Sequence, residues 1–297
     1  MICIENDLVN GFEAAIRGMR NPMNSWDKSD SGFCTDFLCG GVCLSGYVNC
    51  PEWKNDECSV ATQYLFEAGI PFVIGPNDMK LAKSLVKSGS DHAKFRRMIT
   101  VYCDILAPLY WWKEFDTYKV GTVANSCSTM HKIAEKPFKV DDFSHEHIMD
   151  DYDDGCPQIC AALEDGDLLR PDDILHLIVG MLNVCRSRYL ETKDKRYWWQ
   201  MIQLLPSSYN QKRTIMLSYE VLSNIYHARC SHKLDEWRNF CHWIETLPYA
   251  DGLIFQREGK TDEDCNTCAR INSCEYKPGH EELTRYNCPN YSKKESL

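Results

Sequence analysis

The stretch that most constrains the fold is RMITVYCDILAP, residues 97–108, because it is the one run that clearly predicts a β-strand. It is rich in apolar and β-branched residues and ends at Pro108, as strands often do. The aromatic segment 109–115 places apolar residues three positions apart and predicts a helix. The second half of residues 109–133, with Gly121 and five Ser, Thr or Asn residues, predicts a loop. This order of strand, helix and loop indicates a mixed structure.

Most of the remaining sequence pattern is helical. Apolar spacing, N-cap residues and stop residues such as Gly89 and Pro206 predict several helices. They cover residues 6–20, 75–89, 170–191 and 193–206, and two more fall within 209–248, the first ending near His227. A chain with many helices and few strands is expected to belong to the α+β class.

Length and composition indicate a globular protein without a membrane span. The chain has 297 residues, of which 44% are hydrophobic and 26% charged, and its net charge is −10. A broad nucleic-acid surface is not expected, because neutralising phosphates requires a concentrated basic stripe. No apolar run approaches the roughly 18 residues that a membrane helix needs, and the N-terminus lacks the pattern of a secretory signal. We therefore expect a cytoplasmic protein.

Seventeen cysteines are many for such a chain, and two groups of them have spacings that suit a metal. Without an export signal, metal ligation or plain thiols are favoured over disulfides. Four thiolates in the C-terminal group suit zinc or an iron–sulfur cluster, and its two-residue gap lets two of them reach one ion. The predicted ligands are Cys265, Cys268, Cys274 and Cys288. Five cysteines in 34–58 predict a second site or a partner to the first. The alternative for both groups is free thiols.

Residues 139–155 are rich in aspartate and also contain His145 and His147. The simpler interpretation is an acidic, solvated connection. The alternative is a carboxylate–histidine metal site, which would suit a metal-dependent hydrolase.

The most informative segment for function is WWKEFDTYKVGTVANSCSTMHKI, residues 111–133. One interpretation is a nucleotide pocket in which the aromatic residues face a ring and polar groups bind the base and the phosphate. Those polar groups would be Lys113, Lys119, Asn125, Ser126 and Ser128. The alternative is a buried aromatic helix followed by a polar turn.

Two segments together resemble the flavin-dependent thymidylate synthase (ThyX-like) family. In that family a strand ends in an Ala-Pro pair and an aromatic helix follows, which is similar to Ala107–Pro108 and LYWWKEF here. The second family segment has a Leu-Pro and, eighteen positions after the Pro, an Asn leading into an Arg. Pro206, Asn224 and Arg229 match it without a gap. The segment KSLVKSGSDHAKF, which holds His92, occupies the place of the family's His-containing segment.

The chain departs from the family where phosphate is bound. The family's Arg-His-Arg triplet is replaced by Thr117-Tyr118-Lys119, and its Asn-Glu pair by Asn125-Ser126, whereas its Ser is kept as Ser128. Thr and Tyr cannot supply the guanidinium forks that hold a pyrophosphate or a nucleotide phosphate, although Lys119 keeps part of the attraction.

The resemblance implies a thymidylate synthase complementing protein-like fold, with a small central, mostly antiparallel sheet flanked by long helices. It implies a domain over 1–255 that contains a Cys-rich insertion at 31–60, followed by a Cys-rich tail at 256–297. It also implies a homotetramer that binds FAD, folate and a pyrimidine nucleotide such as dUMP, and that acts as a methyltransferase at C5 of the base.

The resemblance also implies roles for residues in the second half of the chain and for His92. Arg229 would join the substrate-binding residues, and the cofactor-binding residues would be His92, Asn224 and His232. A phage or bacterial source would suit this family. The alternative, favoured by the missing arginine triplet, is a non-catalytic nucleotide-binding or assembly protein on the same fold, with structural zinc or iron–sulfur.

Overall fold

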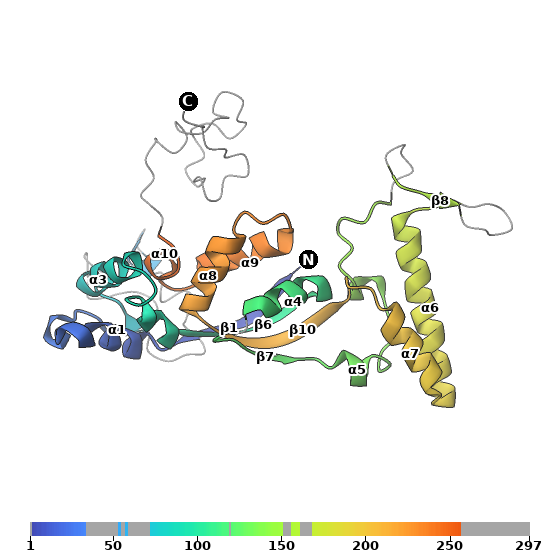
Figure 1. Ribbon diagram of the computed structural model, residues 1–297, viewed down its shortest axis with the longest axis horizontal. Coiled ribbons are helices and arrows are strands. Elements are labelled where there is room, and N and C mark those ends of the chain that lie inside the picture. The colour runs from blue at the N-terminus through green and yellow to red at the C-terminus, as the bar shows by residue number, and fades with distance from the viewer. Residues whose placement is uncertain are drawn as a thin grey trace, which may run out of the picture. The chain divides into compact units, whose positions relative to one another are not determined.

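The computed structural model describes residues 2–33, 53–54, 57–58, 72–118, 120–150, 156–160 and 168–256 (Figure 1). Helices and strands are mixed within these residues, as the sequence predicts. The helices are α1 (Phe12–Arg20), α3 (Pro76–Lys87), α4 (Leu109–Phe115), α5 (Thr129–Lys132), α6 (Pro171–Thr192), α7 (Lys195–Leu204), α8 (Tyr219–Arg229), α9 (Asp235–Thr246) and α10 (Ala250–Leu253). The strands are β1 (Cys3–Asn10), β2 (Gly32–Phe33), β3 (Trp53–Lys54), β4 (Glu57–Cys58), β5 (Phe72–Val73), β6 (Thr100–Pro108), β7 (Val123–Ser126), β8 (Ile159–Cys160), β9 (Leu168–Leu169) and β10 (Asn210–Ser218).

Four strands form the main sheet in the order β1-β6-β10-β7. Hydrogen bonds show that β6 and β10 run antiparallel. Asp104 accepts a bond from the Thr214 hydroxyl at 2.6 Å, and five positions further along, the Leu109 amide donates to the Tyr209 carbonyl at 3.0 Å. Residue numbers therefore rise along one strand as they fall along the other. The three two-residue ladders are also antiparallel, so the expectation of a small antiparallel sheet is confirmed.

The chain divides into two compact units, and each is discontinuous in sequence. Unit 1 comprises Met1–Glu5, Cys103–Lys119 and Val123–Ile215, and unit 2 comprises Asn6–Tyr102, Val120–Thr122 and Met216–Leu297. Strands β1, β6 and β10 each run from one unit into the other. The expected domain over 1–255, the insertion at 31–60 and the tail at 256–297 remain predictions.

The core of unit 1 is built largely on α6 and α7, which pack side by side (Figure 1). Pro171 occupies the first turn of α6, where the proline's missing amide hydrogen is not needed. From there Leu175, Val179 and Leu182 recur at helical spacing on the buried face. Each such side chain contributes roughly 1.5–3 kcal/mol when it is fully buried. No helix in the described part of the chain is both long and apolar enough to cross a membrane.

Unit 2 has a core of large aromatic and aliphatic side chains, among them Tyr219 and Trp237, which are fully buried. Its first helix follows β1 through a turn at Gly11, whose φ is 97°. A Cβ atom at this position would lie 2.1 Å from the backbone oxygen of Met98. Only glycine combines this left-handed conformation with such a close backbone approach.

The structure confirms several elements that the sequence predicts and corrects two helices. The helix expected over 6–20 is wrong in its first part, because β1 extends through Asn10 and only Phe12–Arg20 is helical. The helix expected from 209 begins only at Tyr219, because Asn210–Ser218 is a strand. In that strand Gln211, Ile215 and Leu217 are buried at even spacing, which is the period of a strand with one buried face.

The loop expected in the second half of residues 109–133 also contains regular structure. Val123–Ser126 forms β7, the strand next to β10. All four of its side chains are exposed, and its sequence Val-Ala-Asn-Ser does not alternate between apolar and polar residues as a half-buried strand does.

Candidate functional site

The aromatic residues of α4 are buried. Trp111, Trp112 and Phe115 are 0%, 1% and 2% exposed. The rings of Trp111 and Phe115 stack at 5.0 Å, and Trp112 Nε1 donates to the Gln211 carbonyl at 2.9 Å. The expectation that these rings face a ligand is therefore wrong, and the alternative of a buried aromatic helix is correct for them. Lys113 lies on the exposed side of α4.

Arg213 of β10 forms hydrogen bonds and a ring contact that hold the end of α4 and Asp116, the residue after it. Its guanidinium lies 4.2 Å from the Trp112 ring, donates to Asp116 Oδ1 at 2.9 Å and donates to Gln211 Oε1 at 3.0 Å. The side-chain Nε2 of Gln211 in turn donates a hydrogen bond to the Cys127 carbonyl at 2.9 Å. These contacts hold the chain at Asp116, before the polar residues 123–128, and at Cys127 within them, so Arg213 has a structural role.

The predicted polar residues of unit 1 follow one another on β7 and at the start of α5. Asn125 and Ser126 are exposed on β7. The Ser128 hydroxyl caps α5 by accepting a bond from the His131 amide at 3.2 Å. Lys119 lies outside the described residues. The substrate roles predicted for these residues and for Lys113 stay predictions.

Directly after this segment, the structure contains a cavity of about 410 Å³ between α5, α6 and α7. Its lining combines aromatic rings with an ammonium group and an imidazole. The lining residues are Met130, His131, Ile133, Ala134, Tyr189, Lys195, Trp198 and Trp199. We call this the aromatic pocket.

Local sequence explains why these residues converge. Lys193 takes a left-handed conformation at φ 55° and ends α6, and Asp194 then caps α7 by accepting from the Arg196 amide at 2.9 Å. This turn brings Tyr189, in the last turn of α6, beside the first turn of α7. The Arg196 side chain also donates to Asp194, which holds the pKa of that carboxyl below its usual value.

Two tryptophans form one wall of the aromatic pocket. Trp198 Nε1 donates to the Met130 carbonyl at 3.1 Å, which ties α7 to α5. The Trp199 ring lies 4.9 Å from the Trp198 ring and is 48% exposed, so its face is open to a ligand. Lys195 forms no ion pair or hydrogen bond with the rest of the described chain. A flat ring beside an anionic group would suit this combination.

The other predicted residues belong to unit 2. Arg229 ends α8 with its guanidinium 5.1 Å from the Trp237 ring, and His232 lies 6.3 Å from the same ring. His232 Nδ1 also accepts from the Leu234 amide at 3.2 Å. The structure thus brings Arg229 and His232 together around a buried tryptophan. Asn224 is exposed on α8, and His92 is exposed in the turn that follows α3.

The predicted metal ligands lie outside the described residues. This applies to Cys265, Cys268, Cys274 and Cys288, and also to most of the cysteines in 34–58. In the part of the chain that the structure describes, no three His, Cys, Asp or Glu side chains gather as a metal ion requires. The described part of the acidic segment, with His145 and His147, therefore has no such group.

Guanidinium groups are strong partners for a pyrophosphate, but the arginines of unit 1 are engaged within the chain. Every arginine in the described part of this unit already binds an acceptor of the chain. These pairs are Arg170 with Asp173, Arg186 with the Ala134 carbonyl, Arg188 with Glu191, Arg196 with Asp194, and Arg213 with Asp116. The arginines in the described part of unit 1 are therefore engaged with the chain itself, whereas the aromatic pocket offers Lys195 to a smaller anion.

Comparison with known proteins finds similarity only among solved structures, since no family model and no curated protein matches. The chain is similar to a crystal structure of thymidylate synthase X from Helicobacter pylori with FAD and dUMP. The TM-score is 0.48 at 11% identity, over 86% of this chain and 96% of that chain. A second structure of the same protein with FAD and dUMP gives 0.48 at 12% identity, over 86% and 97%. No residue role in this chain follows from a similarity of this size.

The sequence prediction did not include the residues of the aromatic pocket. The segment KRYWW at 195–199 predicts a helix, and this pattern alone does not show that Trp199 is exposed. The useful signal was the pair of cations beside three aromatic residues, which is an unusual composition for a helix that only supports a core.

Proposed function

We propose that this protein is a divergent relative of the flavin-dependent thymidylate synthases that binds a pyrimidine nucleotide such as dUMP. The observation that carries the proposal is the aromatic pocket. Its exposed Trp199 would stack on the base, and Lys195 and His131 would face the phosphate. The pocket begins two residues after Ser128, where the resemblance to the family predicts nucleotide-binding side chains.

The positions of the family landmarks support the same proposal. Ala107–Pro108 ends β6 and α4 follows at once, as the resemblance requires. Pro206 precedes β10, and Asn224 and Arg229 lie on the helix that follows this strand. We therefore propose the enzyme activity that the resemblance implies, a methyl transfer to C5 of the base with FAD and folate. Lys113, Lys119, Asn125, Ser126, Ser128 and Arg229 would bind substrate, and His92, Asn224 and His232 would bind cofactor.

The engaged arginines of unit 1 favour a second candidate function. A nucleotide-binding or assembly protein without catalysis needs the aromatic pocket but does not need a flavin pyrophosphate site. Zinc or an iron–sulfur cluster on Cys265, Cys268, Cys274 and Cys288 would then have a structural role.

The absorption spectrum of the purified full-length protein and its titration with dUMP separate these candidates. Flavin bands that are released on denaturation, together with dUMP binding, would support the enzyme. A protein without flavin that binds dUMP would support the binding protein. If dUMP does not bind, both candidates are wrong.

The variant Lys195→Gln tests the pocket itself. It removes the ammonium group that we place near the phosphate, so affinity for dUMP should fall about tenfold while affinity for deoxyuridine stays the same. Lys28→Gln, at an exposed position of unit 2, is the matched control and should change neither value. Equal losses for the nucleotide and the nucleoside would contradict the assignment of Lys195 to the phosphate.

We further propose that the protein is a homo-oligomer, a tetramer by the resemblance, and that α6 contributes an interface. The outer side of α6 exposes Leu177, Met181 and Val184 at 55%, 52% and 58%. Their spacing of four and three residues is that of a coiled-coil seam. A Cβ atom at Gly180, between them, would meet no other part of the described chain within 4 Å, so a second helix could approach closely there.

The charges of α6 suit an antiparallel copy of the same helix. When Gly180 is aligned with Met181 of a second copy, Leu177 falls opposite Val184, and Asp173 falls opposite Arg188. A surface that complements itself in this way is what a two-fold symmetric interface requires.

A further inference from the structure

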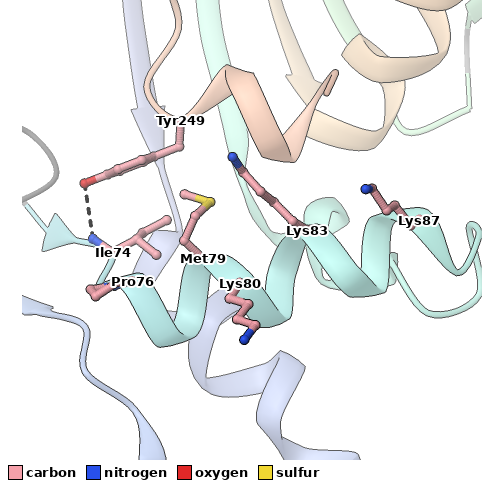
Figure 2. A pocket seen from close by; sticks show the side chains of 7 residues that line it. All are labelled: Ile74, Pro76, Met79, Lys80, Lys83, Lys87 and Tyr249. Carbon is pink, nitrogen blue, oxygen red and sulfur yellow. Dashed lines mark hydrogen bonds between the residues drawn. The ribbon is translucent and has the colours of Figure 1, made fainter. Parts of the chain in front are cut away.

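A second cavity, in unit 2, is not used by the proposed function. It has a volume of about 510 Å³ and lies along α3 (Figure 2). The lining residues are Ile74, Pro76, Met79, Lys80, Lys83, Lys87 and Tyr249. We call it the lysine pocket, because three cations accompany an otherwise apolar lining.

The apolar wall of the lysine pocket is held in place by Tyr249. This residue takes a left-handed conformation at φ 53°. Its hydroxyl accepts from the Ile74 amide at 3.1 Å, as Figure 2 shows, and donates to the Phe72 carbonyl at 3.4 Å. Its ring meets the edge of Phe12 at 5.4 Å. The phenol ring is therefore a fixed surface in the absence of a ligand.

Helix α3 is held equally firmly. Asp30 accepts from the Asn77 and Asp78 amides at 2.8 Å and 3.0 Å, which caps the helix from a distant part of the chain. Asp78 is fully buried, and its Oδ1 accepts a hydrogen bond from Arg20 Nε at 2.5 Å. The three lysines of the lysine pocket occur at i, i+3 and i+7 of this fixed helix, so their stems start from defined positions.

The stem of Lys83 occupies the space that a side chain at Gly252 would take. Gly252 of α10 has φ 108°, and a Cβ atom there would lie 2.5 Å from Lys83 Cε. The Lys83 carbonyl also accepts from Gln256 Nε2 at 2.9 Å. Figure 2 shows Lys83 extending from α3 toward α10, whereas Lys80 extends from the other side of α3. Lys83 is thus the cation that the fold positions most directly.

The three ammonium groups have no acidic partner within the described residues. Neither an ion pair nor a side-chain hydrogen bond joins Lys80, Lys83 or Lys87 to the rest of that part of the chain. This is notable in a protein whose net charge is −10. Lys83 and Lys87 lie four residues apart on α3, so their like charges repel one another, and a bound anion beside them removes this cost.

We propose that the lysine pocket binds an organic anion with an apolar or aromatic body and a phosphate or carboxylate group. The body packs on Tyr249, Met79 and Ile74, and the anionic group binds Lys83 with support from Lys87. This pairing follows the general pattern of ligand sites, in which apolar walls supply contact area and a few charged groups fix orientation. The inference is independent of the nucleotide site in unit 1.

The test is calorimetric titration of the full-length protein with four small probes. The probes are 1-naphthyl phosphate, 1-naphthoate, 1-naphthol and inorganic phosphate. We expect binding of one or both naphthyl anions, and at least tenfold weaker binding of naphthol and of inorganic phosphate. The stronger of the two naphthyl anions identifies the anionic group. If neither naphthyl anion binds more tightly than naphthol, the proposal is overturned.

Variants locate the binding. Lys83→Met keeps the apolar stem but removes the charge, so the affinity for the preferred naphthyl anion should fall about tenfold. Lys87→Met, at an exposed position, should reduce it less, and it serves as the test if Lys83→Met does not fold. Lys28→Met is the control. Unchanged affinity in the two α3 variants would refute the site, and saturating dUMP should not displace the probe.

Discussion

The indole Nε1 of Trp198 donates a hydrogen bond to the backbone carbonyl of Met130 at 3.1 Å, across 68 positions of sequence. This bond ties the first turn of α7 to α5 and keeps the Trp198 ring against the chain. Trp199, its neighbour, has no such bond to the Met130 segment and turns an open face toward the aromatic pocket. Of the two adjacent tryptophans, Trp198 therefore has a structural role, and Trp199 is the one available to bind a ligand.

The first prediction follows from this division. Trp199→Ala should reduce the affinity for dUMP about tenfold, because base stacking on an aromatic side chain contributes about 1–3 kcal/mol. Thermal stability should change little, since the ring is half exposed. Titration calorimetry and a thermal melt measure the two effects. Trp26→Ala removes an equally exposed tryptophan of unit 2 and should leave dUMP affinity unchanged. Equal affinity of both variants would contradict a base site at Trp199.

The second prediction concerns Asp78. Burial by itself would raise the pKa of this carboxyl, but hydrogen bonds from Ser29, Ser31 and Arg20 outweigh burial and lower the pKa below its usual value of 3.8. The unfolded chain therefore takes up this proton more readily, and the stabilisation is fully present above about pH 4 and is lost as pH falls through the folded-state pKa.

Urea unfolding of Asp78→Asn at several pH values tests this. At pH 7 the variant should be less stable by about 3 kcal/mol, because the buried Arg20 charge loses its partner. The difference from the native chain should shrink as the pH approaches 3. Asp27→Asn, at an exposed position, is the control and should show no such convergence. A difference that stays constant with pH would show that the carboxylate charge is not the source of the stabilisation.

The third prediction concerns the exposed apolar side of α6. Met181→Lys places a charge in the centre of the proposed interface and should lower the molar mass in solution, to half that of the native oligomer. Light scattering coupled to size-exclusion chromatography measures this mass. Val120→Lys changes an apolar residue that is 92% exposed and belongs to unit 2, so it should leave the mass unchanged. A native mass for Met181→Lys would exclude α6 from the interface.

The fourth prediction concerns the glycine beside Lys83. Gly252→Ala should destabilise the protein by about 2 kcal/mol, because alanine rarely adopts this backbone conformation and its methyl group would displace Lys83. The same variant should weaken binding of the naphthyl anion. Gly32→Ala introduces a methyl group into open space at a position without positive φ and is the control for urea unfolding. Full stability of Gly252→Ala would show that the Lys83 stem moves freely.

Local sequence signals predicted those elements that have a strong pattern of their own. Pro171 and the apolar spacing after it predicted α6, and the β-branched run ending at Pro108 predicted β6. The sequence was ambiguous where a strand carries polar side chains. In β10, Lys212 binds Glu5 of β1 and Thr214 binds Asp104 of β6, so these polar residues are satisfied by other strands of the sheet, which the local pattern does not reveal.

The candidate site was predictable only in part, for a similar reason. The sequence indicated that residues 111–133 combine aromatic and polar groups, but burial separates their roles. Trp112 belongs to the core and Ser128 caps a helix. The pocket that follows is completed by Trp199 and Tyr189, which lie far along the chain. Their convergence depends on the turn at Lys193 between α6 and α7, which the pattern of neither helix predicts.

The passage of β1, β6 and β10 through both units has a practical consequence for anyone dissecting this protein. Each unit is assembled from three separated stretches of polypeptide, so no truncation and no single proteolytic cut releases either one whole. A fragment that stops at Tyr209 would lack the strand that lies between β6 and β7. The contributions of the two pockets are therefore best separated by point substitution in the intact chain, since expression of excised pieces would dismantle both.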